Sequence, residues 1–159
     1  MNGITYGDDR LPERFWAKVD PHESGCWLWT ARVHHSRGYG QFSVDRVMRQ
    51  AHRIAYAALV GEIPARMQLD HQCRVRRCVN PAHLAVVTNK LNAENRPAVN
   101  AKGKPRGVYQ RGDKWFGLVK HNGEYHYTHF HNDQASAVEE VVALRNKIFT
   151  NNLTDRGVT

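Results

Sequence analysis

Residues 69–84 read Leu-Asp-His-Gln-Cys-Arg-Val-Arg-Arg-Cys-Val-Asn-Pro-Ala-His-Leu, and Asn92 follows shortly after them. Within this stretch Cys73, Cys78 and His83 follow the pattern C-x4-C-x4-H. Cysteine thiolates and histidine nitrogens are the ligands that zinc prefers in structural sites. A loop so rich in arginine and so poor in apolar residues has no core of its own, so we expect zinc to hold it folded. Two buried thiols and a surface histidine are the plainer alternative, which this spacing disfavours.

The chain has three cysteines, an odd number that leaves one unpaired in any disulfide scheme. In a reducing cytosol cysteines serve as metal ligands before they form disulfides. A Cys3His site would use all three, with Cys26 as the remaining thiolate. Cys26 lies in Gly-Cys-Trp-Leu-Trp, a segment typical of a short buried strand. The other candidates for the fourth ligand are His22, His34 and His35.

The same stretch carries a second kind of chemistry, because Asp70, His71 and Asn92 are hard-metal ligands or general-base groups. His71 lies two residues before a candidate zinc ligand, so a metal-stapled loop would fix its position, as a general base requires. A neutral imidazole can accept a proton from water near pH 7. By default, however, a lone histidine is structural and Asp70 is a turn residue. Asn92 has Asn89 and Asn95 as equal competitors on the residues alone.

The charge of the chain favours a polyanionic partner such as nucleic acid. Lysine and arginine number 23 against 15 aspartate and glutamate, which gives a formal net charge of +8 and a pI near 9.7. Charge alone does not exclude a merely basic protein without such a partner. The sequence has no apolar run of about 18 residues, so we expect no membrane span. The polar first ten residues lack a signal region, so we expect a cytoplasmic protein.

The pattern predicts an α+β protein of two modules, joined by a basic linker. We expect the first module over residues 1–95, the linker over 96–105, the second module over 106–152 and a tail over 153–159. In the first module we expect a helix with Phe15 and Trp16 turned inward, two strands joined by a turn, and a second helix, over Leu11–Val19, Cys26–Thr30, Tyr39–Val44 and Gln50–Val60. We expect the second helix to bury a face formed by Ile54, Ala57 and Ala58. A ββα unit should follow, over Met67–Leu69, His83–Val87 and Thr88–Asn95.

The second module is expected to be a three-stranded antiparallel sheet with one helix packed on it. The strands are predicted over Gly107–Gln110, Lys114–Lys120 and Tyr125–Phe130, and the helix over Gln134–Phe149. Asn122-Gly123 is a strong signal for a type I′ hairpin between the last two strands. Asn132 or Asp133 can cap the helix, whose apolar stripe runs at i, i+4, i+7 and i+11 from Ala137.

The segment Cys26 to Asn92 resembles the HNH nucleases, and within them the phage- and intron-encoded branch close to the His-Cys box homing endonucleases. The motif is Asp70-His71-x-Cys73-x4-Cys78-x-Asn80-Pro81-x-His83-Leu84, followed by Asn92. The resemblance implies a zinc-stapled ββα-metal fold, with structural Zn2+ on Cys26, Cys73, Cys78 and His83. The second zinc cluster of the His-Cys box enzymes has no cysteines here, which leaves open whether the chain forms a homodimer.

The resemblance also implies roles for the remaining residues. His71 would be the general base, and Asn92 and Asp70 would hold a catalytic Mg2+, for which Mn2+ can substitute. Ala51-His52-Arg53 looks like a family motif, and Arg53 is a candidate for steadying charge on the phosphate. Arg74, Arg76 and Arg77 are the alternatives for that role.

The second module resembles the ethylene-response-factor type of DNA-binding domain. The matching residues are Arg106-Gly107-Val108-Tyr109-Gln110-Arg111, then Lys114-Trp115, then Thr128-His129-Phe130 and the Ala/Val-rich helix. The resemblance implies that the sheet lies in the major groove of double-stranded DNA. The candidate DNA-binding residues are Arg106, Tyr109, Arg111, Trp115, Lys120 and Tyr127. An ordinary solvated sheet face is the alternative.

Together these observations predict a DNA endonuclease of the homing type, giving 5′-phosphate and 3′-hydroxyl ends and acting in the bacterial host of a phage or mobile element. The rival hypothesis is a non-catalytic, zinc-stapled DNA-binding regulator. The two differ only at Asp70, His71 and Asn92, which a pure DNA-binding protein does not need.

Overall fold

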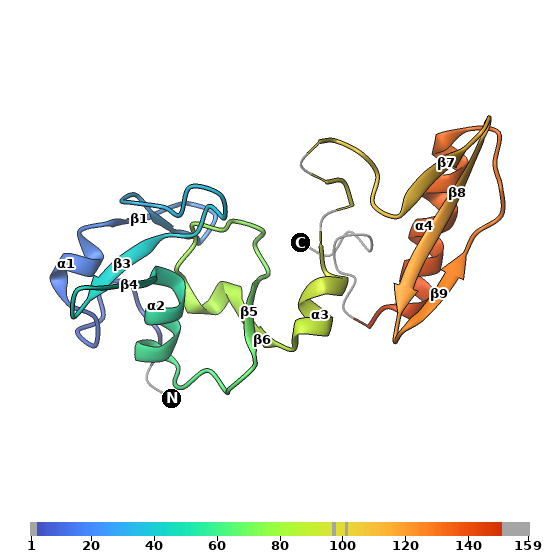
Figure 1. The fold of residues 1–159 in the computed structure, drawn as a ribbon. Helices are drawn as coiled ribbons and strands as arrows, with labels where there is room; N and C mark the ends of the chain where they lie inside the picture. The colour runs from blue at the N-terminus through green and yellow to red at the C-terminus, as the bar shows by residue number, and fades with distance from the viewer. Residues whose placement is uncertain (1–2, 97, 101, 151–159) are drawn as a thin grey trace. The chain divides into compact units, whose positions relative to one another are not determined.

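The computed structural model describes residues 3–96, 98–100 and 102–150, and it separates into two compact units, Met1–Asn89 and Lys90–Thr159 (Figure 1). Both units mix helices with small antiparallel sheets, so the predicted α+β class is confirmed. The division falls at Asn89, whereas the sequence predicts the module boundary near Arg96. The expected end of the second module at Asn152 and the tail 153–159 lie outside the described residues.

The core of the first unit is a cluster of aromatic rings. It is contributed by α1 (Glu13–Trp16), β2 (Trp27–Trp29) and β3 (Gln41–Val44). Phe15 and Trp29 are fully buried, with ring centroids 5.1 Å apart, and Phe42 lies 5.2 Å from Phe15. Large rings bury much apolar surface per residue, which helps a unit of this size to form a core. The predicted inward orientation of Phe15 and Trp16 is confirmed.

The strands of the first unit pair differently from the prediction. β2 pairs with β1 (Val19–Pro21), and β3 pairs with β4 (Val47–Gln50), so the two predicted strands are not joined to each other in one hairpin. The β3–β4 turn is made by Asp45 and Arg46, whose φ angles are 49° and 63°. Two consecutive left-handed residues suit a tight hairpin, but neither is the asparagine or glycine that normally marks such a turn. The sequence therefore gave no signal for it.

The buried face of α2 (Ala51–Leu59) also differs from the prediction. Ala51, Ala55 and Leu59 are buried, at spacings of four residues, whereas Ala57 is exposed. Ile54, expected on the buried face, is only partly buried and packs against the edge of the core. Because apolar residues cover more than half of the circumference of this helix, apolar periodicity alone could not fix its rotation.

The central ββα stretch has the predicted order of elements. β5 (Gln68–His71) pairs antiparallel with β6 (Leu84–Val87), and Asp70 and His71 lie opposite Ala85 and Leu84. A short 3-10 helix, η1 (Pro81–His83), precedes β6, and α3 (Asn89–Glu94) follows it. The intervening loop returns directly beside the end of β5, because Gln72 N–H donates to the carbonyl of His83 at 2.9 Å.

The second unit has α4 (Gln134–Ile148) on one face of the sheet formed by β7 (Val108–Arg111), β8 (Lys114–His121) and β9 (Glu124–Tyr127) (Figure 1). Val119, Val141 and Phe149 are buried between the sheet and the helix. Asp133 caps the helix by accepting from Ser136 N–H at 2.8 Å, as predicted. No helix among the described residues, α4 included, is long and apolar enough to cross a membrane.

Candidate active site and metal centre

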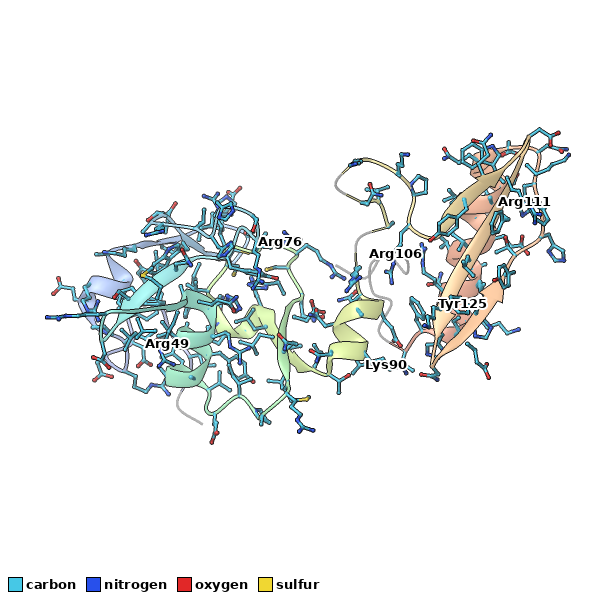
Figure 2. The ribbon with its side chains drawn as sticks, viewed as in Figure 1. Arg49, Arg76, Lys90, Arg106, Arg111 and Tyr125 are labelled. Atoms are coloured by element: carbon cyan, nitrogen blue, oxygen red, sulfur yellow. The ribbon has the colours of Figure 1, made fainter. Side chains whose placement is uncertain are left out.

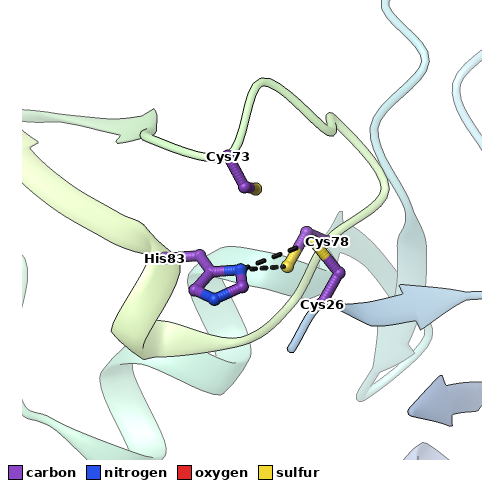
Figure 3. Close-up of side chains that lie close together, drawn as sticks. All are labelled: Cys26, Cys73, Cys78 and His83. Atoms are coloured by element: carbon purple, nitrogen blue, oxygen red, sulfur yellow. Dashed lines mark hydrogen bonds between the residues drawn. The ribbon is translucent and has the colours of Figure 1, made fainter. Parts of the chain in front are cut away.

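Three sulfur atoms and one imidazole converge in the first unit (Figure 3). The ligand atoms of Cys26, Cys73, Cys78 and His83 all lie within 4.8 Å of one another. His83 Nδ1 is 3.4 Å from Cys26 Sγ and 3.6 Å from Cys78 Sγ. Tetrahedral zinc with bonds of about 2.0–2.3 Å requires ligand atoms about 3.3–3.8 Å apart. The donor set and the two distances from His83 therefore fit zinc, and the group can hold it with small shifts of the other ligand atoms.

Backbone contacts bring Cys26 to the distant loop that carries the other ligands. Val79 N–H donates to the carbonyl of Trp27 at 2.8 Å, beside a bridge between Leu28 and Cys78. The Asn80 side chain donates to the carbonyl of Gly25 at 2.7 Å and accepts from Ala82 N–H at 3.0 Å. Asn80 thus holds the two halves of the metal group together.

Gly25 is required beside Cys26 for two reasons. Its φ of +77° lies in the left-handed region, and a Cβ there would meet the His83 ring at 3.4 Å. A larger residue would therefore strain the turn and press against a ligand.

The thiols of Cys73 and Cys78 have pKa values shifted in opposite directions. The pKa of Cys73 is lowered to about 5, chiefly because its thiolate accepts a hydrogen bond from the Cys78 thiol. The pKa of Cys78 is raised, because it donates that hydrogen bond and is buried. The lowered pKa favours the thiolate form of Cys73, and binding of zinc would also displace the proton of Cys78.

His71 is oriented by the same loop. Its Nε2 lies 3.0 Å from the carbonyl oxygen of Cys78, and the side chain is buried. A carbonyl only accepts hydrogen bonds, so Nε2 carries the proton and Nδ1 of the neutral ring is the acceptor. Burial lowers the pKa of His71, which keeps the ring neutral at pH 7. A fixed, neutral imidazole of defined tautomer is what a general base needs.

Two rings that sequence reasoning missed pack around His71. His52 meets it edge-on with ring centroids 4.8 Å apart, and Tyr39 stacks on it at 5.7 Å. Burial lowers the pKa of His52 to about 3, with further contributions from His71 and Arg53. Its buried Nδ1 has no hydrogen-bond partner in the part of the chain that the structure describes. The Ala51-His52-Arg53 motif contains His52, but positive charge suited to phosphate pointed to Arg53 and not to His52.

The other predicted residues of the first unit lie on neighbouring elements. Asp70 is buried at the end of β5, and its Oδ2 accepts from Gln72 Nε2 at 3.3 Å. Arg53 lies on α2 directly after His52 and is partly exposed. Arg76 donates to the carbonyl of Arg37 at 3.2 Å, and its guanidinium lies 5.9 Å from the centre of the Tyr39 ring.

Asn92 lies on α3, within the second compact unit. Its relation to Asp70 and His71 therefore rests on the resemblance, and its role as a metal ligand stays a prediction. Asn92 is partly exposed, whereas Lys90 and the competing residue Asn89 are exposed.

Four of the six predicted DNA-binding residues share one face of the second unit, which we call the exposed sheet face. Gly117 and Val119 of β8 face α4, so the alternate residues of the sheet face away from it. Cross-strand pairing then places on this face Tyr109, Arg111, Lys114, Phe116, Lys120, Tyr125 and Tyr127 (Figure 2). The three tyrosines are 50–65% exposed, and the Lys120 ammonium lies 4.9 Å from the Tyr125 ring.

The other two, Trp115 and Arg106, lie elsewhere. Trp115 has the strand parity of Gly117 and Val119, the side covered by α4. Arg106 precedes β7, and its guanidinium donates to backbone carbonyls at the end of α3. A DNA contact by either residue stays a prediction without support from its position.

Residues 49–94 match the protein-family model described as HNH endonuclease, from β4 to the end of α3. A domain of this family indicates a metal-dependent nuclease, that is, a phosphodiester hydrolase, which agrees with the predicted class of enzyme. The matched range contains Arg53, Asp70, His71 and Asn92, together with the metal-binding loop.

Two curated relatives come from Escherichia phage T7. Protein 7.7 is 36% identical over 70 residues, which are 44% of this chain and 53% of that protein. Protein 2.8 is 28% identical over 106 residues, 65% of this chain and 70% of that protein. The chain thus spans about half the length of the first relative. No solved structure matches the chain.

We predict about one zinc ion per purified chain, because one Cys3His group that could hold it is present among the described residues. Cys26→Ser should lower zinc content and thermal stability together, since zinc binding is part of folding in so small a unit. Metal analysis and a thermal melt measure both quantities. His22→Ala is the matched control and should keep its zinc, because His22 Nδ1 bonds Ser24 instead of the metal group. Full zinc occupancy in Cys26→Ser would contradict the assignment.

Proposed function

We propose that the chain is a DNA endonuclease of the homing type, with His71 as general base. The observation that carries this proposal is the bond from His71 Nε2 to the Cys78 carbonyl, which leaves Nδ1 as the acceptor nitrogen. Nδ1 would take a proton from a water molecule while the water oxygen attacks the scissile phosphorus. The bond from phosphorus to the 3′-oxygen then breaks, and the leaving oxygen takes a proton from a second water molecule, giving 5′-phosphate and 3′-hydroxyl ends.

Asp70 and Asn92 would hold the catalytic divalent ion, which we propose to be Mg2+, with Mn2+ able to replace it. Carboxylate and amide oxygens are the ligands that hard cations prefer, and buried Asp70 lies directly before the base. When bound, such an ion stabilises negative charge on the phosphate and the leaving oxygen. Arg53 would add positive charge on the substrate side, with Arg74, Arg76 and Arg77 as the alternatives.

The exposed sheet face would bind double-stranded DNA. It combines three basic side chains, Arg111, Lys114 and Lys120, with exposed aromatic rings on a single surface. Basic groups suit phosphates, and a three-stranded sheet can enter a DNA groove. The two T7 relatives support a phage origin.

The alternative is a zinc-stapled regulator that binds DNA without cutting it. It shares the metal group and the exposed sheet face with the nuclease, but it gives no reason for a buried histidine of fixed tautomer. A plasmid-cleavage assay with and without Mg2+ separates the two. Cleavage that needs the ion supports the nuclease, whereas tight binding without cleavage under any divalent ion supports the regulator.

We predict that His71→Ala reduces the cleavage rate by about 10² to 10⁴, because it removes the general base. DNA affinity and the thermal melt should stay close to those of the natural protein. His35→Ala removes an exposed imidazole and should cleave normally. If His71→Ala cleaves at nearly the natural rate, the proposed mechanism is wrong.

We further predict that Asn92→Ala raises the Mg2+ concentration needed for half-maximal cleavage, because it removes an oxygen ligand of the ion. Asn89→Ala, three residues earlier and exposed, is the control and should leave this concentration unchanged. The measurement is a Mg2+ titration of cleavage at saturating DNA. Equal effects of the two substitutions would contradict the role of Asn92 as a ligand of the catalytic ion.

For the exposed sheet face, we predict that replacing Arg111 and Lys120 by alanine weakens DNA binding and makes it less sensitive to salt. Each lost phosphate contact should flatten the log–log salt dependence by about 0.9. Binding is measured without Mg2+ over a range of salt concentrations. Lys147→Ala, at an exposed position of α4, is the control. An unchanged slope in the double variant would mean that this face does not contact DNA.

A further inference from the structure

The last residues of α3, the helix that carries Asn92, are held by residues of the C-terminal module, that is, the second module that begins at Arg106. α3 has six residues, and an isolated helix of that length is not stable in water. Its position must therefore come from tertiary contacts. Within the second unit these contacts converge on two charged residues, Arg106 and Glu94.

Arg106 closes the C-terminal end of α3 (Figure 2). Its Nη1 donates to the carbonyls of Glu94 at 3.0 Å and Arg96 at 3.1 Å, and its Nη2 donates to that of Ala93 at 3.0 Å. Carbonyls at the end of a helix lack partners within the helix, and the helix dipole favours a cation there. A guanidinium can serve several of them at once because its donors are fixed in a plane.

Arg106 is itself held by α4 and the residue that follows it. Its carbonyl accepts from Arg145 Nη1 at 2.6 Å, and Arg145 is only 2% exposed. Its guanidinium lies 5.5 Å from the centre of the buried Phe149 ring. The end of α3 is thus connected, through one side chain, to the core of the C-terminal module.

Glu94 makes a second connection at the same end of the helix. Its side chain is 4% exposed, and Oε2 accepts from the backbone N–H of Thr150 at 2.9 Å and from its hydroxyl at 3.1 Å. Oε1 lies 3.4 Å from Lys90 Nζ and 3.4 Å from His121 Nε2. A buried carboxylate with these partners ties α3 to the end of α4 and to β8.

We propose that Glu94 and Arg106 are positioning residues that fix Asn92 for binding of the catalytic metal. This inference rests on the proposed function, because it takes Asn92 as a metal ligand. Asn92 lies two residues before Glu94, so any movement of the last turn of α3 moves it. Residues that orient a metal ligand typically change metal affinity or activity by about 10- to 100-fold when they are removed.

The proposal competes directly with the role that the resemblance implies for Arg106. As a DNA contact, Arg106→Ala would lower DNA affinity and flatten its salt dependence. As a positioning residue, it would leave DNA affinity nearly unchanged and raise the Mg2+ concentration needed for half-maximal cleavage. Arg111→Ala, the same substitution on the exposed sheet face, is the matched control, with the opposite expected pattern.

The experiment compares the natural protein with Arg106→Ala and Glu94→Leu, and uses the full chain. It measures DNA affinity without Mg2+, the Mg2+ dependence of cleavage, and hydrogen exchange of the amides of α3. We expect faster exchange in α3 and about a 10- to 100-fold higher Mg2+ requirement in both variants. Glu94→Gln keeps an oxygen that can accept from Thr150, so it should fall between Glu94→Leu and the natural protein. Glu139→Leu, at an exposed position of α4, is the control for Glu94→Leu.

Lower DNA affinity with an unchanged Mg2+ requirement in Arg106→Ala would overturn the proposal. So would unchanged exchange of α3 in both variants. If Glu94→Leu fails to fold, Glu94→Gln and Arg106→Ala decide. If the natural protein does not cleave DNA at all, the proposed function fails, and hydrogen exchange alone then decides whether these residues hold α3.

Discussion

Cys78 takes part in three interactions at once. Its sulfur belongs to the Cys3His group, its carbonyl accepts from His71 Nε2, and its backbone bridges to Leu28 of β2. A metal ion on the sulfur would therefore fix the carbonyl that sets the tautomer of His71. The metal-binding group and the proposed general base are then mechanically linked, because Cys78 supplies both the sulfur of the group and the carbonyl of the hydrogen bond. This explains why so small a unit can keep a buried imidazole in one orientation without a large core around it.

The features that the sequence could predict are those set by local spacing. The pattern C-x4-C-x4-H identified three of the clustered residues, and the odd cysteine count identified Cys26. The apolar stripe of α4 and the Asn122-Gly123 hairpin were equally local, and the structure confirms both. The helix stripe, the hairpin and the C-x4-C-x4-H pattern each depend on residues that are close together in the sequence. Cys26 could be assigned because the chain has only one further cysteine.

The features that escaped prediction depend on which of several similar residues packing selects. Apolar residues cover more than half of the circumference of α2, so their pattern does not determine which side of the helix is buried. The pattern therefore does not show whether His52 or Arg53 lies on the buried side. The turn at Asp45 and Arg46 is left-handed without glycine, because the paired strands on both sides enforce it. The contact of His52 with His71 joins a helix to a strand end, and no sequence period encodes such a crossing.

Arg106 illustrates how a resemblance can carry a residue without carrying its contacts. The matching motif places Arg106 just before the sheet, where a positive charge suggests a contact with DNA phosphate. In this structure, however, the guanidinium of Arg106 donates to the backbone carbonyls at the end of α3. Helix-end carbonyls are numerous and attract a cation as a phosphate does, so sequence alone does not distinguish the two partners. The contacts of Arg106 with α3 therefore do not support a strict division in which the first module only cleaves DNA and the second only binds it. The helix bearing Asn92 is too short to stand alone, and its last turn is fastened by residues of the module assigned to binding.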